Sequence, residues 1–258
     1  MSRLRALAFY IAFFGVTALL GVAGVPLLLM PRRSVMRFGR FWARCVLALL
    51  KATIGLDGEI RGLEHVPAGP CIIAMKHQSA WDTLILPVVL DDFAVVVKRE
   101  LFFVPFYGWY AARAGSIAID RRGGAGALRH MLRAARRAAA AGRPVVIFPE
   151  GTRTAPGQRL VYQPGVAALY QDLQLPVVPA AVNSGLFWGR RSFVKRPGRI
   201  VLAFLERIAP GLPRREMMSE LEARIEAATS ALEQEGSADY RAGGNQSSSP
   251  LPRIWSSE

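Results

Sequence analysis

The feature of this sequence that most limits how the chain can fold is a stretch of 26 residues, 6–31, without a charged side chain. About 20 apolar residues in a helix are enough to cross the hydrocarbon core of a bilayer. The apolar core of a cleaved signal peptide, the competing interpretation, is normally shorter. Gly15, Gly21, Gly24 and Pro26 lie inside the stretch and make a kinked or re-entrant helix as plausible as a straight span. The N-terminus is therefore predicted to associate with a membrane.

A second helix is predicted directly afterwards, over roughly Ser34–Ile54. Its basic side chains recur at helical spacing on one face: Arg33, Arg37, Arg40, Arg44 and Lys51. This pattern is typical of a helix in a membrane interface that faces anionic lipid, although an ordinary amphipathic surface helix shares it. Both flanks of the apolar stretch are basic, so we expect residues 1–57 to form a monotopic hairpin on the cytoplasmic face, which in a bacterium is that of the inner membrane.

From residue 58 to 235 short apolar runs alternate with helical patterns. Strands are predicted at Glu59–Gly62, Cys71–Met75, Phe93–Lys98, Ser116–Asp120, Val145–Phe148, Val177–Val182 and Ile200–Leu205, and helices at Thr83–Leu90, Ala125–Ala141, Gly165–Leu173 and Arg215–Glu235. The alternation predicts one α/β domain with a mixed, largely parallel sheet flanked by helices. Gly, Ser, Asn and Pro dominate residues 236–258, which are predicted to be a disordered tail.

The net charge of +14 is concentrated in three segments. Residues 1–60 hold eight basic and two acidic side chains, 121–143 seven and none, and 186–215 eight and one. Such segments suit an anionic partner, which is a nucleic acid, an anionic lipid or a phosphorylated substrate. The two cysteines, Cys45 and Cys71, have no metal-ligand spacing, and we expect them to be unpaired in a reducing compartment.

His77 follows a predicted strand directly, and Asp82 comes five residues later. In a continuous helix this offset leaves the two side chains roughly 140° apart. Ser79 is a good N-cap, however, and Asp82 then falls at the third helical position of a capping box, which places His77 in the preceding loop. There the carboxylate can accept one ring N–H and leave the other nitrogen as a base. The alternative is a carboxylate that only caps the helix beside an incidental histidine.

A second polar segment, Pro149–Arg153, follows the strand at Val145–Phe148. Proline and glycine around an acidic residue force an irregular turn at the carboxyl end of a strand, where open α/β sheets place their sites. Arg153 offers a guanidinium suited to phosphate, and the backbone N–H groups of Gly151 and Thr152 can add to it. A surface turn with a solvated arginine is the alternative. Two more segments, Gly115–Arg122 and the proline-interrupted Val177–Val182, also fall on strands.

In this order the four segments resemble the lysophosphatidic acid acyltransferase branch of the glycerolipid acyltransferase family, over roughly residues 58–235. The pairing of His-x4-Asp with Phe-Pro-Glu-Gly-Thr-Arg about 70 residues later is highly specific. The resemblance implies that His77 is a general base oriented by Asp82. It also implies that the segments ending in Arg121 and Arg153 bind the acyl-glycerol-phosphate, with Lys98 near the phosphate.

The resemblance further implies transfer of a fatty acyl group from acyl-CoA or acyl-carrier protein to the free sn-2 hydroxyl of lysophosphatidic acid, in phospholipid synthesis. Glu150 is expected to order the binding loop or to contact acceptor hydroxyls. No metal or bound cofactor is implied. The sequence has no G-x-S-x-G elbow, P-loop or G-x-G-x-x-G motif, so no covalent acyl-enzyme is required.

The sequence departs from the family pattern at three positions. Lys76 precedes the histidine where Asn is common, Thr154 stands where Ser is common, and Gln163 lies in a segment that often carries a basic Lys-x-Gly. Lys76 and Gln163 leave the acceptor open, so another lysolipid, such as a lyso-ornithine lipid, is an alternative. A basic membrane-associated nucleic-acid-binding protein is an alternative of another class, but no nucleic-acid module is recognisable and we expect no such partner.

Overall fold

The apolar runs of the sequence form one seven-stranded sheet in the computed structural model, which describes residues 2–243. The strands are β1 (Leu56–Arg61), β2 (Ile72–Met75), β3 (Ala94–Lys98), β4 (Ile117–Ile119), β5 (Val145–Ile147), β6 (Val177–Val182) and β7 (Gly198–Phe204). Their spatial order is β1-β7-β6-β2-β5-β3-β4. Only the β6–β7 pair is antiparallel, which confirms the predicted mixed, largely parallel sheet.

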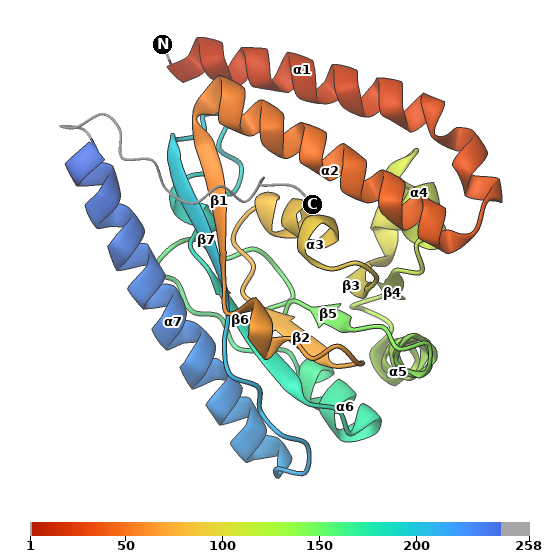
Figure 1. Cartoon of the computed structure of the whole chain (residues 1–258). Helices are drawn as coiled ribbons and strands as arrows, with labels where there is room; N and C mark the ends of the chain where they lie inside the picture. Colours follow the sequence, from red (N-terminus) through yellow and green to blue (C-terminus); the bar gives the residue numbers. More distant parts are fainter. Residues whose placement is uncertain (1, 244–258) are drawn as a thin grey trace.

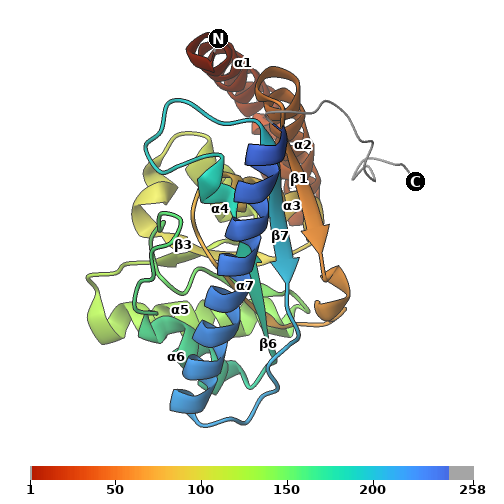
Figure 2. The ribbon, with the colours of Figure 1, turned by 90° about the vertical axis from the view of Figure 1, so that its left-hand side faces the viewer.

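Helices cover both faces of this sheet (Figures 1 and 2). The α-helices are α1 (Ser2–Ala23), α2 (Arg32–Ile54), α3 (Trp81–Val89), α4 (Tyr107–Arg113), α5 (Gly124–Ala140), α6 (Pro164–Leu173) and α7 (Arg214–Gly243). Short 3-10 helices are η1 (Val25–Leu29), η2 (Leu63–His65), η3 (Arg99–Phe103) and η4 (Ser184–Leu186). The helices α2 and α3 pack on one face, and α5, α6 and α7 pack on the other.

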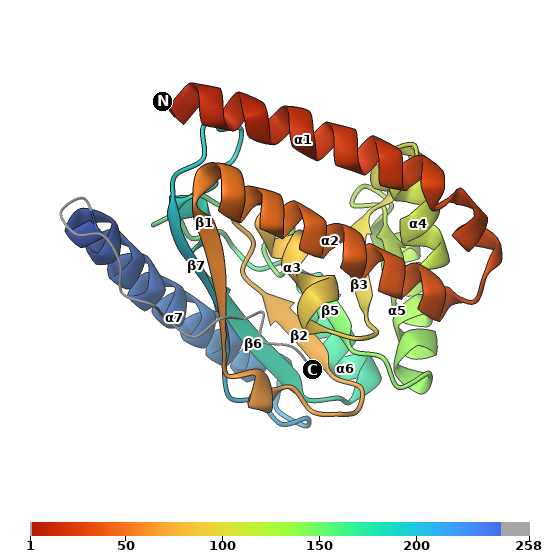
Figure 3. The same cartoon turned by 45° about the horizontal axis from the view of Figure 1, so that its top comes forward.

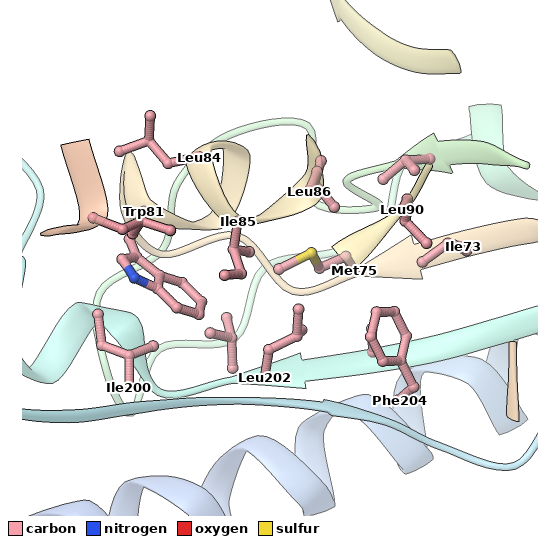
Figure 4. Packing of buried hydrophobic residues seen from close by; sticks show 14 of the residues in the cluster. Ile73, Met75, Trp81, Leu84, Ile85, Leu86, Leu90, Ile200, Leu202 and Phe204 are labelled. Carbon is pink, nitrogen blue, oxygen red and sulfur yellow. The ribbon is translucent and has the colours of Figure 1, made fainter. Parts of the chain in front are cut away.

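The two faces are buried because side chains alternate along each strand. On β2, Ile73 and Met75 point toward α3, where they meet Trp81 and the apolar side chains of β7 (Figure 4). Ile72 and Ala74 belong to the opposite cluster, which includes residues of α5, α6 and α7. Each large side chain buried in this way contributes about 1.5–3 kcal/mol relative to exposure. The core on both faces therefore fixes β2, the central strand from which the candidate site extends.

The two N-terminal helices lie side by side as a hairpin (Figures 1 and 3). The chain turns after α1 at Gly24, and η1 then carries Pro26 in its first turn, as the kink prediction requires. A Cβ at Gly24 would lie 2.5 Å from the Phe38 ring and 2.6 Å from the Tyr110 hydroxyl, so only glycine fits this corner. Among the described residues, α1 alone is long and apolar enough to cross a membrane, with a mean hydropathy of 2.2.

The basic face predicted for α2 is correct only in part. Arg33, Arg37 and Arg44 are exposed. Arg40 instead donates to the carbonyl oxygen of Pro87, 2.8 Å away, and pairs with the Asp91 carboxylate. These acceptors lie at the C-terminal end of α3. The spacing of basic residues along α2 could not predict that α3 packs there. Arg40 therefore joins α2 to α3 and does not belong to a lipid-facing surface.

Two helical regions correct the expected boundaries. The helix α4 was not predicted; it begins after Phe106, whose backbone has φ of 62°. The predicted disordered tail, 236–258, is wrong for residues 236–243, because α7 continues to Gly243, and residues 244–258 lie outside the described part. Gly236 is buried on α7, where a Cβ would lie 2.9 Å from the Asn183 amide nitrogen. Close packing at this glycine outweighs its low helix propensity.

Candidate active site

The predicted site segments all follow strands that run in the same direction. The strands β6, β2, β5, β3 and β4 are mutually parallel neighbours, so their carboxyl ends lie along one edge of the sheet. This edge of an open α/β sheet is where ligands usually bind. Because β2 lies between β6 and β5, the His77 loop is flanked by the segment after β6 and by the segment that contains Glu150.

The structure brings His77 and Asp82 into contact. The Nδ1 atom of His77 lies 2.8 Å from Asp82 Oδ2, and the two side chains are 13% and 0% exposed. Since a carboxylate only accepts, this contact assigns the proton of the neutral ring to Nδ1 and leaves Nε2 as its basic nitrogen. The ring also stacks on Phe148 at a centroid distance of 4.1 Å, which further restricts its orientation.

Backbone groups hold the Asp82 carboxylate in place, but the predicted capping box forms only in part, because α3 begins after Ala80 and not after Ser79. Oδ2 accepts from the backbone N–H groups of Gln78 at 2.7 Å and Ser79 at 2.8 Å. The Ser79 hydroxyl accepts from the Trp81 N–H at 3.1 Å. The first turn of α3 thus binds the carboxylate locally, and the same carboxylate reaches His77. The sequence left open whether the Asp82 carboxylate binds only backbone N–H groups before α3 or also contacts His77. In the structure it does both.

A serine that sequence reasoning missed completes this cluster. Ser184, in η4 directly after β6, is fully buried, and its hydroxyl donates to Asp82 Oδ1. The two residues lie 102 positions apart. The only available signal was the strand at Val177–Val182, which predicted an edge position for the residues after it and nothing about this hydroxyl.

Lys76 lies in a second cluster, on the other side of the same loop. Its Nζ atom lies 2.7 Å from Glu150 Oε1 and 2.7 Å from Glu226 Oε1, and the residue is 1% exposed. Tyr162 donates a hydroxyl hydrogen bond of 3.0 Å to the same Glu226 oxygen. The hypothesis that Lys76 affects acceptor choice is therefore not supported by its position, because its ammonium is enclosed by two carboxylates. Glu226, on α7, was missed by sequence reasoning.

Glu150 is buried beneath the loop and contacts its backbone. Its Oε2 accepts from the His77 N–H at 3.3 Å, and the Thr154 hydroxyl lies 3.0 Å from both Glu150 Oε1 and the His77 carbonyl oxygen. Burial raises the pKa of the Glu150 carboxyl, and the hydrogen bond from Lys76 opposes that shift. Of the two roles expected for Glu150, this geometry supports ordering of the loop. Thr154 keeps the hydroxyl of the serine that is common at its position.

The predicted phosphate-binding residues are brought together in part. Arg121 approaches Gly151, since its Cζ atom is 3.9 Å from the place a Cβ would occupy there. The side chains of Lys98 and Arg153 are exposed, and within residues 2–243 no hydrogen bond or ion pair joins either side chain to the other predicted residues. The Gly151 N–H was predicted to bind phosphate, but it donates to the Phe148 carbonyl oxygen at 2.9 Å and is therefore not free to do so. The loop uses it for its own turn.

Comparisons with known proteins place the chain in a family. The family model described as Acyltransferase matches residues 58–183. A 1-acyl-sn-glycerol-3-phosphate acyltransferase of Pseudomonas aeruginosa is 39% identical over 173 residues, 67% of each chain. One from Saccharomyces cerevisiae is 30% identical over 145 residues, 55% of this chain and 48% of the relative. A crystal structure of a 1-acyl-sn-glycerophosphate acyltransferase from Thermotoga maritima has a TM-score of 0.74 at 20% identity, covering 90% of this chain and 99% of that one.

The similarity of fold and sequence defines the class of this protein as an O-acyltransferase. The matched residues contain His77, Asp82 and the segment from Glu150 to Arg153, which carried the resemblance in the sequence. The chain belongs to the acyltransferase family, and its resemblance to the lysophosphatidic acid acyltransferase branch is confirmed.

Proposed function

We propose that this protein transfers a fatty acyl group from a thioester carrier to the sn-2 hydroxyl of lysophosphatidic acid, which gives phosphatidic acid. The observation that carries this proposal is the 2.8 Å contact between His77 Nδ1 and Asp82 Oδ2 at the carboxyl edge of the sheet. The names of the related acyltransferases support the acceptor.

In the proposed reaction, His77 Nε2 removes the proton of the acceptor hydroxyl as its oxygen attacks the thioester carbonyl carbon. The new C–O bond forms, the C–S bond breaks, and the leaving thiolate takes the proton from the imidazolium. Asp82 stabilises the imidazolium and holds the neutral ring in the tautomer that has its proton on Nδ1, so that Nε2 is the basic nitrogen. General-base help of this kind contributes about 10²–10⁴-fold. Both reactants are substrates, so the scheme uses no resident metal or cofactor.

Positioning of the acceptor supplies much of the remaining rate enhancement. Arg153 and Lys98, both exposed at this edge, and Arg121 beside Gly151 are the proposed contacts of the acceptor phosphate. Arg153→Ala is expected to raise the acceptor KM, and Arg153→Lys is expected to rescue it poorly, because an ammonium lacks the bidentate fork. If only the donor KM changed, Arg153 would belong to the carrier side.

The hairpin is proposed to bind the cytoplasmic face of the membrane without crossing it, with anionic lipids against Arg33, Arg37 and Arg44 of α2. The paired packing of α1 and α2 supports this arrangement over an isolated span. A cysteine placed at Ser2, in a chain lacking Cys45 and Cys71, should resist an impermeant reagent added outside intact spheroplasts. Labelling of that cysteine would contradict the hairpin proposal.

The function itself is tested with purified full-length protein, labelled acyl-CoA or acyl-carrier protein, and a panel of acceptors. Phosphatidic acid should form from lysophosphatidic acid with either or both donors, and His77→Ala should abolish it. A higher kcat/KM on a lyso-ornithine lipid would shift the proposal to that acceptor and leave the chemistry unchanged. Binding of DNA that weakens with salt, without acyl transfer, would favour the other class of function.

A further inference from the structure

A group of apolar side chains on η3 and α4 is exposed, although each has a size and character typical of a core. The group, here called the η3–α4 surface, consists of Leu101, Phe103, Val104, Tyr107 and Trp109. Phe103 is 75% exposed and Trp109 is 50% exposed. Single exposed apolar residues need no explanation, but five within nine positions of one segment form a patch of the kind that marks a contact surface.

This segment is fastened to the end of the N-terminal hairpin. The Phe106 ring lies against Gly21 of α1, where a Cβ would be 3.3 Å away, and the Tyr110 hydroxyl donates to the Gly21 carbonyl oxygen at 2.8 Å. Arg113 Nε donates to the Leu28 carbonyl oxygen at 2.9 Å. Figures 1 and 3 both show α4 beside the turn that joins α1 to α2. The segment and the hairpin are therefore held in one fixed orientation.

The apolar surface of the hairpin continues up to this junction. Leu19 and Val22, in the last turns of α1, and Leu29 of η1 are all strongly exposed. They lie within a few residues of Gly21 and Leu28, the two positions to which α4 is hydrogen bonded. A bilayer that binds the end of the hairpin would therefore also contact the η3–α4 surface.

The charges and residue types around this surface select the partner. Residues 98–113 contain Lys98, Arg99 and Arg113 but a single acid, Glu100. Tyrosine and tryptophan side chains are favoured at the boundary between lipid headgroups and acyl chains, and basic side chains next to them attract anionic headgroups. A protein partner would not require this continuity with the apolar hairpin, so the observations favour a lipid surface.

We infer that η3 and α4 form a second membrane-contacting element, which holds the carboxyl edge of the sheet against the bilayer. The acceptor then enters from the leaflet along η3. This helix begins directly after Lys98, the last residue of β3, and Arg121 follows the neighbouring strand β4, so both proposed phosphate contacts lie at its start. The entry route rests on the proposed function. The membrane contact itself does not depend on which lysolipid is acylated.

The direct test places an environment-sensitive dye on the surface. In a chain with Cys45 and Cys71 replaced by serine, Trp109→Cys is labelled, and vesicles of phosphatidylcholine with phosphatidylglycerol are added. Fluorescence is expected to rise and shift to the blue with vesicles. The matched control is Leu63→Cys, since Leu63 is 45% exposed on η2, which follows β1, the strand at the opposite edge of the sheet from β4. Equal responses at both positions, or no response at position 109, would overturn the inference.

Two further outcomes are distinguished in the same experiment. A blue shift that grows with protein concentration, without vesicles, would show that a second copy of the chain covers the surface, and would overturn a lipid contact. The dye measurement needs no turnover, so it is independent of the acyl-transfer assay. Absence of lysophosphatidic acid acylation with a normal dye response would defeat the proposed function and the entry route alone.

The entry route is tested with Phe103→Ser combined with Trp109→Ser. We expect the acceptor KM to rise at least tenfold with lysophosphatidic acid in vesicles, a change of about 1.4 kcal/mol. With a short-chain acceptor dissolved below its micelle concentration, kcat/KM should stay as in the wild type. Leu63→Ser should change neither value. The route would be contradicted if the double variant lost equal kcat/KM on both acceptors while its thermal unfolding matched that of the wild type.

Discussion

Lys76 and His77 are neighbours in the sequence, yet their side chains enter opposite surroundings. Successive side chains of an extended backbone point to opposite sides, and the loop after β2 keeps this alternation. His77 retains a 13% exposed ring with one carboxylate partner. Lys76 is enclosed between two carboxylates, Glu150 and Glu226, with a 1% exposed side chain.

The difference separates a reactive group from the framework that holds it. A base needs one satisfied nitrogen, which fixes its tautomer, and one nitrogen that a substrate can reach. A framework residue is most effective when every polar atom has a partner, because an unpaired buried charge is strongly destabilising. The Lys76 cluster links this loop to α7 through Glu226, and Gln78 adds a second link through its hydrogen bond to Glu233.

The largest effect on turnover is expected when the reactive group, His77, is removed. His77→Ala should lower turnover by at least about 10²–10⁴-fold, because the acceptor hydroxyl loses its base. The thermal unfolding curve should stay close to that of the wild type. Asp82→Asn should also lose most activity, since the imidazolium loses its counter-charge. Initial rates with lysophosphatidic acid check both variants; near-wild-type turnover in either one would remove the assignment.

Breaking the framework side should act mainly on stability. Lys76→Met removes the cation between Glu150 and Glu226, leaves Glu226 only the more distant Arg159 at 3.9 Å, and should cost about 3–5 kcal/mol of unfolding free energy. Glu226→Gln, the matched control, keeps the Lys76–Glu150 pair and should cost much less. Urea unfolding measures the difference. If Lys76→Met unfolded like the wild type and lost only acceptor affinity, Lys76 would instead belong to the acceptor site.

Ser184→Ala tests whether the His77–Asp82 cluster can be weakened separately from the Lys76 cluster, because it removes one hydrogen bond and leaves no charge unpaired. The Asp82 carboxylate loses one donor but keeps the two backbone N–H groups and His77. A hydrogen bond to a charged group contributes about 1.5–3 kcal/mol, so we expect turnover to fall by roughly tenfold or more. The kcat pH profile is the second measurement. An unchanged rate and profile would show that Ser184 only fills space.

The smallest effect concerns Lys195, a buried lysine that has no carboxylate partner among residues 2–243. Its Nζ atom lies 4.0 Å from the centre of the Tyr10 ring, and burial lowers its pKa to about 8. Between that value and about 10.4 the unfolded chain binds more protons than the folded one, so stability should rise with pH in this window. After allowance for the cation–π contacts we expect a rise of about 1–2 kcal/mol. Lys195→Met should remove it, as measured by urea unfolding from pH 7.5 to 10.

Local features of the sequence were sufficient to predict much of this protein. The apolar stretch and its turn at Gly24 predicted the hairpin, and alternating runs predicted the parallel sheet. The His77–Asp82 contact was also predictable, since Asp82 lies in the first turn of α3 and accepts from the backbone N–H of Ser79, as in one half of a capping box. Such features act over a few residues, where spacing alone determines which groups meet.

Only the tertiary structure decided which distant groups complete these local units. Ser184 reaches Asp82 across 102 residues, and Glu226 reaches Lys76 across 150. Neither partner is marked by its own segment, because a buried serine and an acidic helical residue have many other roles. The helix α4 was hidden for a related reason: the ring of Phe106, at the turn before α4, packs against Gly21 of α1, which is distant in the sequence. Pairings of this kind follow from strand order and helix packing, which no local period in the chain records.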